Sequence, residues 1–174
     1  HKLLAAEHPD LLTLIAPRHP ARGPEIRAEA QAAGLAAALR SETAEIDPKI
    51  AVYVADTLGE MGLWYRLCEI AFVGGSLVDR GGQNPLEAAR LGSALLFGPH
   101  DEKNAAAVRG LAEAGALERV GSAEEIAAAV ARLLEDADLR RTRGAAAKRF
   151  AAAQDHIVDE VLDALVPLLP GARP

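Results

Sequence analysis

Several short apolar runs in this sequence are each followed by glycines, cations or small polar residues. These residue types suit a ligand that carries phosphate and sugar groups. The planar fork of arginine matches a phosphate, glycine lets a ligand approach the backbone closely, and a carboxylate can bridge two ribose hydroxyls. The residues that we expect to form this phosphate-and-sugar site are Pro17, Arg18, Gly59, Glu60, Met61, Gly62, Gly75, Ser76, Asn84 and Glu87.

The segment 74–87 carries a large share of the expected site. Gly74-Gly75-Ser76 and Gly81-Gly82 could simply turn the chain, but a plain turn needs fewer glycines. We therefore interpret this segment as a place where a ligand approaches the backbone. Arg18 supports the same interpretation, because a surface salt bridge at the end of a strand would contribute little.

Two motifs in the expected site have a purely structural alternative. In Asn84-Pro85-x-Glu87, Asn84 suits the N-cap position, Pro85 suits the first helical position, and Glu87 suits the third position of a capping box. Thr57-x-x-Glu60 matches the same pattern. Capping and binding are compatible, because a capped helix start still offers N–H groups to an anion. Both alternatives therefore stay open for these glutamates.

The sequence gives no sign of a metal, a cofactor or a catalytic nucleophile. Asp56 has no partner carboxylate at ligand spacing, and Cys68 has no cysteine or histidine at zinc-ligand spacing. Neither G-x-G-x-x-G after the first apolar run nor G-x-x-x-x-G-K-[ST] is present. His19 is more typical of a packed or exposed histidine than of an acid or base. We expect neither a metal nor a cofactor.

Short apolar runs alternate with amphipathic stretches, which is typical of a parallel α/β sheet. Because ligands bind beyond the carboxyl ends of such strands, this fold class gathers the site residues at one edge. We predict a doubly wound, mostly parallel sheet of six strands. The expected strands are 11–17, 35–40, 50–56, 69–75, 93–99 and 117–120, and the expected helices are 24–34, 59–68, 85–91, 104–115, 123–135, 139–154 and 156–169.

Composition excludes several classes of partner. The 174 residues carry a net charge of −6, which disfavours nucleic acid as the main partner. Six aromatic residues are too few for base-stacking platforms, and no apolar run approaches the roughly 18 residues of a membrane span.

We expect one main domain at 1–154 and a C-terminal helix and tail at 155–174 that packs towards another domain. The chain opens within a helical stretch and resembles a piece of something longer.

The order of these clusters resembles the C-terminal half of the 3-deoxy-D-manno-octulosonic acid (Kdo) transferases of Gram-negative bacteria. The resemblance runs from about residue 1 to about residue 165, and the run 72–87 is its most specific part. Gln83 departs from the histidine that is usual in the family. The residues that carry the resemblance are Pro17-Arg18-His19-Pro20-x-Arg22, DTLGEMG at 56–62, FVGGSLVDRGGQNPLE at 72–87, Phe97-Gly98-Pro99-His100 and Asn104.

The resemblance implies half of a GT-B glycosyltransferase, in which two Rossmann-like domains face each other across a cleft. The C-terminal domain holds the donor, CMP-Kdo. On that resemblance the donor contacts are Arg18 at the phosphate, 59–62 around the nucleotide, Gly75 and Ser76 at the phosphate or sugar, and Asn84 and Glu87 at the phosphate and ribose.

The family transfers Kdo to the lipid A precursor with inversion and without a metal, at the cytoplasmic face of the inner membrane. Its catalytic base is a carboxylate of the N-terminal domain. We therefore expect a soluble half-enzyme that binds CMP-Kdo but does not transfer it, because positioning and proton removal need both domains. The alternatives are the donor domain of another GT-B transferase or of a UDP-sugar epimerase, and a nucleotide-binding module without chemistry of its own.

Overall fold

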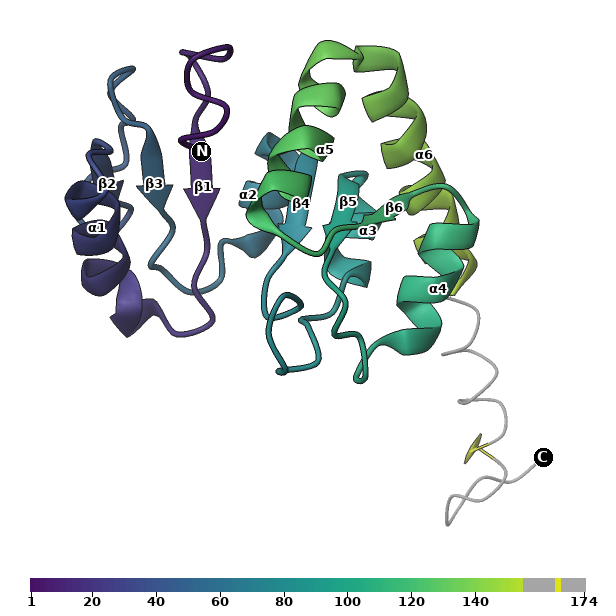
Figure 1. Ribbon diagram of the computed structural model, residues 1–174. Coiled ribbons are helices and arrows are strands. Elements are labelled where there is room, and N and C mark those ends of the chain that lie inside the picture. Colours follow the sequence, from purple (N-terminus) through teal and green to yellow (C-terminus); the bar gives the residue numbers. More distant parts are fainter. Residues whose placement is uncertain (155–164, 167–174) are drawn as a thin grey trace. The chain divides into compact units, whose positions relative to one another are not determined.

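The computed structural model describes residues 1–154 and 165–166, and it divides into two compact units, His1–Leu67 and Cys68–Pro174 (Figure 1). The C-terminal helix predicted at 156–169 lies outside the described residues, apart from 165–166. The predicted domain boundary at 154/155 therefore stays a prediction. Within the described part of the chain, no helix combines the length and the apolar character needed to cross a bilayer.

The first unit is built on three parallel strands in the order β1-β3-β2. The two outer strands both pair with the central strand, Val52–Val54. Both faces of the sheet are covered, as is usual for parallel strands. Val52 and Val54 pack with residues of the first long helix on one face, whereas Tyr53 packs with Trp64 on the other. The elements of this unit are β1 (Thr13–Ile15), η1 (Pro20–Arg22), α1 (Gly23–Ala32), β2 (Ala37–Leu39), β3 (Val52–Val54) and α2 (Met61–Leu67).

The second unit has three parallel strands in the order β4-β5-β6. All four residues of the central strand, Ala94–Phe97, are fully buried. The α5 residues Ala129 and Leu133 pack against Ala94 and Leu96 of this strand. The elements of this unit are β4 (Ile70–Val73), α3 (Leu86–Leu91), β5 (Ala94–Phe97), α4 (Ala105–Glu113), β6 (Leu117–Arg119), α5 (Ala123–Glu135) and α6 (Ala137–Ala153).

The predicted fold class is confirmed, since the described chain is α/β and its six strands are all in parallel pairs. The strands form two sheets of three rather than the single sheet of six that we predicted. An apolar run identifies a strand but not its hydrogen-bonding partner, and this explains the difference. Helix α6 begins at Ala137, two residues before the predicted start, because Asp136 caps it by accepting a hydrogen bond from the Leu139 N–H.

Candidate functional site

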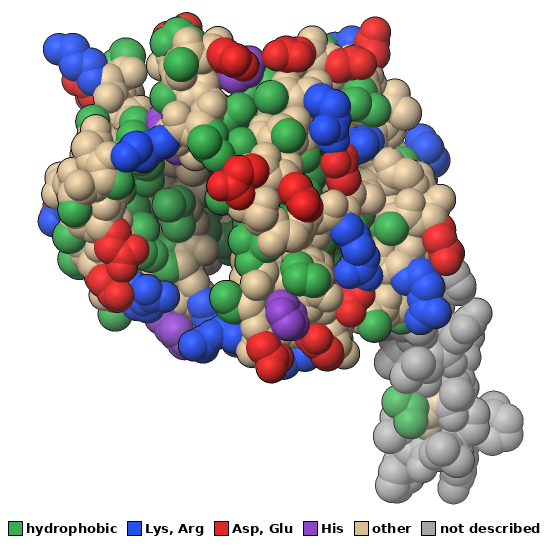
Figure 2. All heavy atoms as spheres, viewed as in Figure 1, with side chains coloured by type: hydrophobic (Ala, Val, Ile, Leu, Met, Phe, Trp, Pro, Cys, Tyr) green, Lys and Arg blue, Asp and Glu red, His purple; other side chains and the backbone are tan. Residues whose placement is uncertain are grey.

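The segment after β1 brings Pro17 and Arg18 to the carboxyl end of the first sheet. Arg18 and His19 are exposed, and Figure 2 shows cationic and histidine side chains along the lower edge of the first unit, where its strands end in Figure 1. Arg22 forms an exposed ion pair with Glu25 at 3.0 Å. The predicted gathering of cations after the first strand is therefore present.

Gly23, at the start of α1, allows the loop after β3 to pack against this helix. A Cβ atom at Gly23 would lie 2.6 Å from the Cβ of Asp56. The Asp56 carboxylate is itself held after β2, where it accepts hydrogen bonds from the backbone N–H of Ser41 at 2.9 Å and from its hydroxyl at 2.6 Å. Asp56 thus ties together the segments that follow β2 and β3.

The carboxylate of Glu60 lies just before α2 and is fully engaged by protein groups. It accepts from Arg40 Nε at 3.0 Å and from Arg40 Nη2 at 2.8 Å, and the Thr57 hydroxyl donates to it as well. These hydrogen bonds lower the pKa of Glu60 to about 2, that of Arg40 having the larger effect. The capping box predicted for Thr57 and Glu60 is wrong, because Glu60 precedes the helix instead of lying at its third position.

The backbone beside Glu60 is open. Gly59 has φ +81°, and a Cβ placed there would meet nothing within 4 Å. Met61 is 38% exposed. The carbonyl of Gly62 accepts a hydrogen bond from Arg66 Nη1 at 2.6 Å. Of the predicted group 59–62, Gly59 and Met61 are thus accessible to a ligand, and the Glu60 side chain is turned into a protein contact.

In the second unit, Ser76 connects the segments after β4 and β5. Its hydroxyl donates to the Val73 carbonyl at 2.6 Å and accepts from the Gly98 N–H at 2.8 Å. The side chain is fully buried, and a Cβ at Gly98 would lie 2.1 Å from the Ser76 carbonyl oxygen. Because both capacities of the hydroxyl are used, this geometry supports a structural role for Ser76. A side-chain contact with a ligand would require the buried Ser76 side chain to become exposed.

The glycine-rich loop folds back onto the end of β4. The carbonyl of Gly75 accepts from the Gly82 N–H at 3.1 Å, and that of Gly74 accepts from the Gln83 N–H at 3.0 Å. Gly82 has φ +66°, and a Cβ there would lie 2.3 Å from Phe97 Cζ. The structure therefore brings Gly75 next to the loop that leads into α3.

Asn104, at the start of α4, fixes the same loop from the other side. Its Nδ2 donates towards three successive carbonyls, those of Gly81 at 3.4 Å, Gly82 at 3.1 Å and Gln83 at 3.2 Å. Lys103 donates to the Arg80 carbonyl at 2.8 Å. No local pattern reveals this clamp, because the two segments lie some twenty residues apart in the sequence; only the resemblance singled out Asn104.

Helix α3 begins at Leu86 with Pro85 as its N-cap residue, one position later than the predicted capping box requires. Asn84 Oδ1 accepts a hydrogen bond from the Leu86 N–H at 2.9 Å, and the carbonyl of the buried Pro85 accepts from the Ala89 N–H at 3.0 Å. Glu87 lies in the first turn of the helix with an exposed side chain. The Glu87 carboxylate is therefore accessible.

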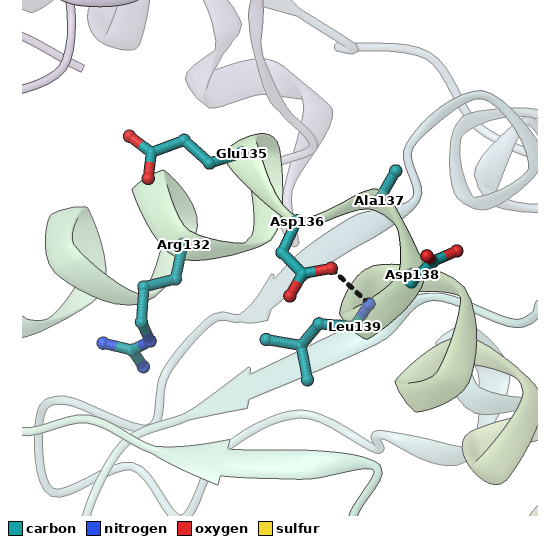
Figure 3. Close-up of a pocket in the computed structure, with 6 residues that line it drawn as sticks. All are labelled: Arg132, Glu135, Asp136, Ala137, Asp138 and Leu139. Carbon is teal, nitrogen blue, oxygen red and sulfur yellow. Dashed lines mark hydrogen bonds between the residues drawn. The ribbon is translucent and has the colours of Figure 1, made fainter.

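Three other features of the second unit involve none of the predicted site residues. Figure 3 shows a shallow depression at the α5–α6 junction, where Asp136 caps the Leu139 N–H; it follows from the bend between two helices. Asp79, His100 and Glu102 form a cluster whose nearest ligand atoms lie within 4.8 Å of one another; Asp79 and Glu102 are exposed and His100 is half-buried. Burial raises the pKa of the Cys68 thiol, which disfavours a reactive thiolate.

No family model matches this chain, but several curated proteins are similar to it. It is 40% identical over 161 residues to a 3-deoxy-D-manno-octulosonic acid transferase of Bordetella pertussis, which covers 92% of this chain and 38% of that protein. The transferase of Haemophilus influenzae is 34% identical over 171 residues, which are 97% of this chain and 40% of the relative. This chain is a homologue of the Kdo transferases. It spans about two fifths of the length of these relatives.

A solved structure is similar over nearly the same range. The C-terminal CMP-Kdo binding domain of WaaA from Acinetobacter baumannii matches 86% of this chain and 79% of that domain, with a TM-score of 0.79 and 29% sequence identity. The expected resemblance to the C-terminal half of the Kdo transferases is thereby confirmed.

Proposed function

We propose that this chain is the donor-binding domain of a glycosyltransferase that uses CMP-Kdo. The observation that carries the proposal is the structural similarity to a CMP-Kdo binding domain over 86% of the chain. The identity of 40% to a transferase of the same sugar supports it independently. The alternatives, a UDP-sugar enzyme or a module without chemistry, have no comparable support.

Taken by itself, each unit has residues of types that suit a nucleotide sugar. In the first unit, Arg18 is exposed after β1 and Gly59 presents open backbone after β3. In the second unit, the loop beside Gly75 leads to Asn84 and to the exposed carboxylate of Glu87. We assign the phosphate to Arg18, and the ribose to Glu87, because carboxylates accept hydrogen bonds from hydroxyl groups.

Pro17, Met61 and Gly62 remain in the proposed donor site as neighbours of these contacts. Glu60 and Ser76 have a different role, since their polar atoms are committed to protein partners. We infer that they shape the two loops and do not bind the donor through their side chains.

For the complete enzyme we propose transfer of Kdo to the lipid A precursor with inversion, at the cytoplasmic face of the inner membrane. The acceptor site and the catalytic carboxylate then belong to an N-terminal GT-B domain. We propose that neither a metal nor a cofactor takes part. The homology to Kdo transferases supports this scheme. This chain spans about two fifths of the length of these relatives, which is consistent with one domain of two.

A titration of the chain with CMP, UMP and AMP, followed by calorimetry or by NMR, tests donor binding. We expect selective binding of CMP, and weaker binding by Arg18→Ala and by Glu87→Ala. Removing one hydrogen bond to a charged group costs about 1.5–3 kcal/mol, which is roughly 10- to 150-fold in affinity. Arg141→Ala and Glu135→Ala are matched controls, because both residues are exposed on other elements.

Equal binding of the three nucleotides contradicts a cytidine donor. If CMP binds selectively but the Arg18 and Glu87 variants bind as tightly as the controls, the donor is recognised elsewhere on the chain.

A further inference from the structure

Arg40, which follows β2, forms a bidentate ion pair with the Glu60 carboxylate. Nη2 donates to Oε1 at 2.8 Å and Nε donates to Oε2 at 3.0 Å. The two side chains are only 23% and 26% exposed. This pair is therefore oriented and partly shielded from water, unlike the exposed pair of Arg22 and Glu25.

The guanidinium also lies over the Trp64 ring. Its central carbon lies 5.8 Å from the ring centroid of Trp64, a cation–π geometry. Trp64 is buried and packs edge-on against Tyr53 at 5.9 Å, and the Tyr53 hydroxyl donates to the Thr43 carbonyl at 2.6 Å. Arg40 is thus anchored in the core of the first unit at one side and holds Glu60 at the other.

This anchoring determines the course of the backbone next to Glu60. Thr57 donates to the same carboxylate, so the segment 57–60 closes into a turn around it. Gly59, with its positive φ and open surroundings, lies within that turn, and the exposed Met61 follows it. If the fork were lost, Glu60 would keep only the Thr57 hydroxyl, and the turn would lose its connection to Trp64.

We propose that Arg40 is a positioning residue for donor binding: it holds Glu60 so that the backbone at 59–62 keeps the conformation that receives the nucleotide. The inference rests on the proposed donor site. The ion pair has a second effect, because the positive charge of Arg40 offsets the negative charge of Glu60 beside an anionic donor. Lysine cannot replace Arg40, since it lacks the two-pronged fork that holds both oxygens of Glu60.

The test compares Arg40→Lys and Arg40→Ala with Arg27→Ala, which removes another arginine ion pair of the first unit. Four quantities are measured for each variant: CMP affinity, the melting temperature, the amide NMR signals of Gly59 and Met61, and the fluorescence of Trp64. Trp64 is the single tryptophan of the chain, so its emission reports on the stacked guanidinium.

We expect both Arg40 variants to shift the two amide signals and the Trp64 emission, and to weaken CMP binding by roughly 2- to 30-fold, the range for residues that act through another residue. A purely structural role would instead lower the melting temperature without a separate effect on affinity. Arg27→Ala should leave the affinity and the two amide signals unchanged. If Arg40→Ala does not fold, the isocharged Arg40→Lys still decides the question.

Normal CMP affinity in both Arg40 variants overturns this inference and leaves the proposed function intact. An unchanged pair of amide signals overturns it as well. A wild-type chain that does not bind CMP overturns the proposed function, and the role of Arg40 in binding fails with it. The two failures are therefore distinguishable.

Discussion

Ser76 illustrates how burial changes the interpretation of a residue that the sequence placed in a site. A serine after two glycines is typical of a phosphate contact, but the Ser76 hydroxyl is enclosed and bonded to Val73 and Gly98. These partners come from the ends of two neighbouring strands, and no spacing in the sequence reveals that they meet. The same applies to Glu60, whose partner Arg40 lies twenty residues away.

Ser76→Ala should lower the free energy of unfolding by about 1–3 kcal/mol, because it leaves the buried Gly98 N–H without its acceptor. Urea denaturation measures this change. Thr142→Ala, at an exposed position on α6, is the control and should stay within about 0.5 kcal/mol of the wild type. Lost CMP binding at unchanged stability would instead return Ser76 to the donor site.

The lowered pKa of Glu60 predicts that the free energy of unfolding depends on pH in the acid range. Its pKa is lowered from the ordinary 4.5 to about 2, so its ionised form is favoured by folding. The resulting stabilisation is fully present above pH 4.5 and is lost as the pH falls towards 2. The stability difference between the wild type and Glu60→Gln should therefore shrink over that interval. Denaturant midpoints at pH 7, 4 and about 2.5 measure it.

The comparison with Thr142→Ala controls for general acid effects, because that substitution removes no titratable group. A difference between wild type and Glu60→Gln that stays constant from neutral to acid pH would contradict the ionic pairing of Glu60 with Arg40.

At the scale of elements, the sequence predicts the features that depend only on residues close together in the chain. That Asn84 bonds to the start of α3 was predictable, because its Oδ1 and the Leu86 N–H belong to residues only two apart, although the N-cap residue is Pro85. The matching motif at Thr57 failed, because α2 begins at Met61 and Glu60 therefore lies before the helix instead of at its third position. Strand positions follow from apolar runs in the same way, whereas the division into two sheets depends on pairing that the runs do not encode.

Gly144 shows that close helix packing can depend on a missing side chain. Helices α3 and α6 pack against each other, and a Cβ at Gly144 would lie 2.1 Å from the carbonyl oxygen of Gly92. Gly144→Ala should therefore lower the free energy of unfolding by about 1–3 kcal/mol, although alanine favours helix more than glycine does. Thermal and urea unfolding measure the loss.

Gly121→Ala is the matched control, because a Cβ there would meet the nearest side-chain atom at an ordinary 3.5 Å. A Gly144→Ala variant as stable as the wild type would mean that α3 and α6 can separate at no cost.

At the scale of the whole molecule, the resemblance predicted the family, and the local chemistry did not. Glycines, an arginine and a carboxylate after parallel strands indicate phosphate and sugar but do not specify the nucleotide base. The sugar and the base were inferred from the order of whole motifs, and the comparisons find similarity to Kdo transferases and to a CMP-Kdo binding domain. The choice between cytidine and uridine therefore needs the titration proposed above.

Transfer of Kdo requires an acceptor hydroxyl placed next to the donor and a base that removes its proton. The proposed donor site holds the sugar donor of this reaction. We assign the acceptor site and the catalytic base to another domain. This chain should therefore bind CMP-Kdo without transferring Kdo to a lipid A precursor, while the full-length transferase of Bordetella pertussis, assayed in parallel, serves as the active control. Turnover by this chain alone at a rate that depends on one of its own carboxylates would place the base here and refute the division of labour between the two domains.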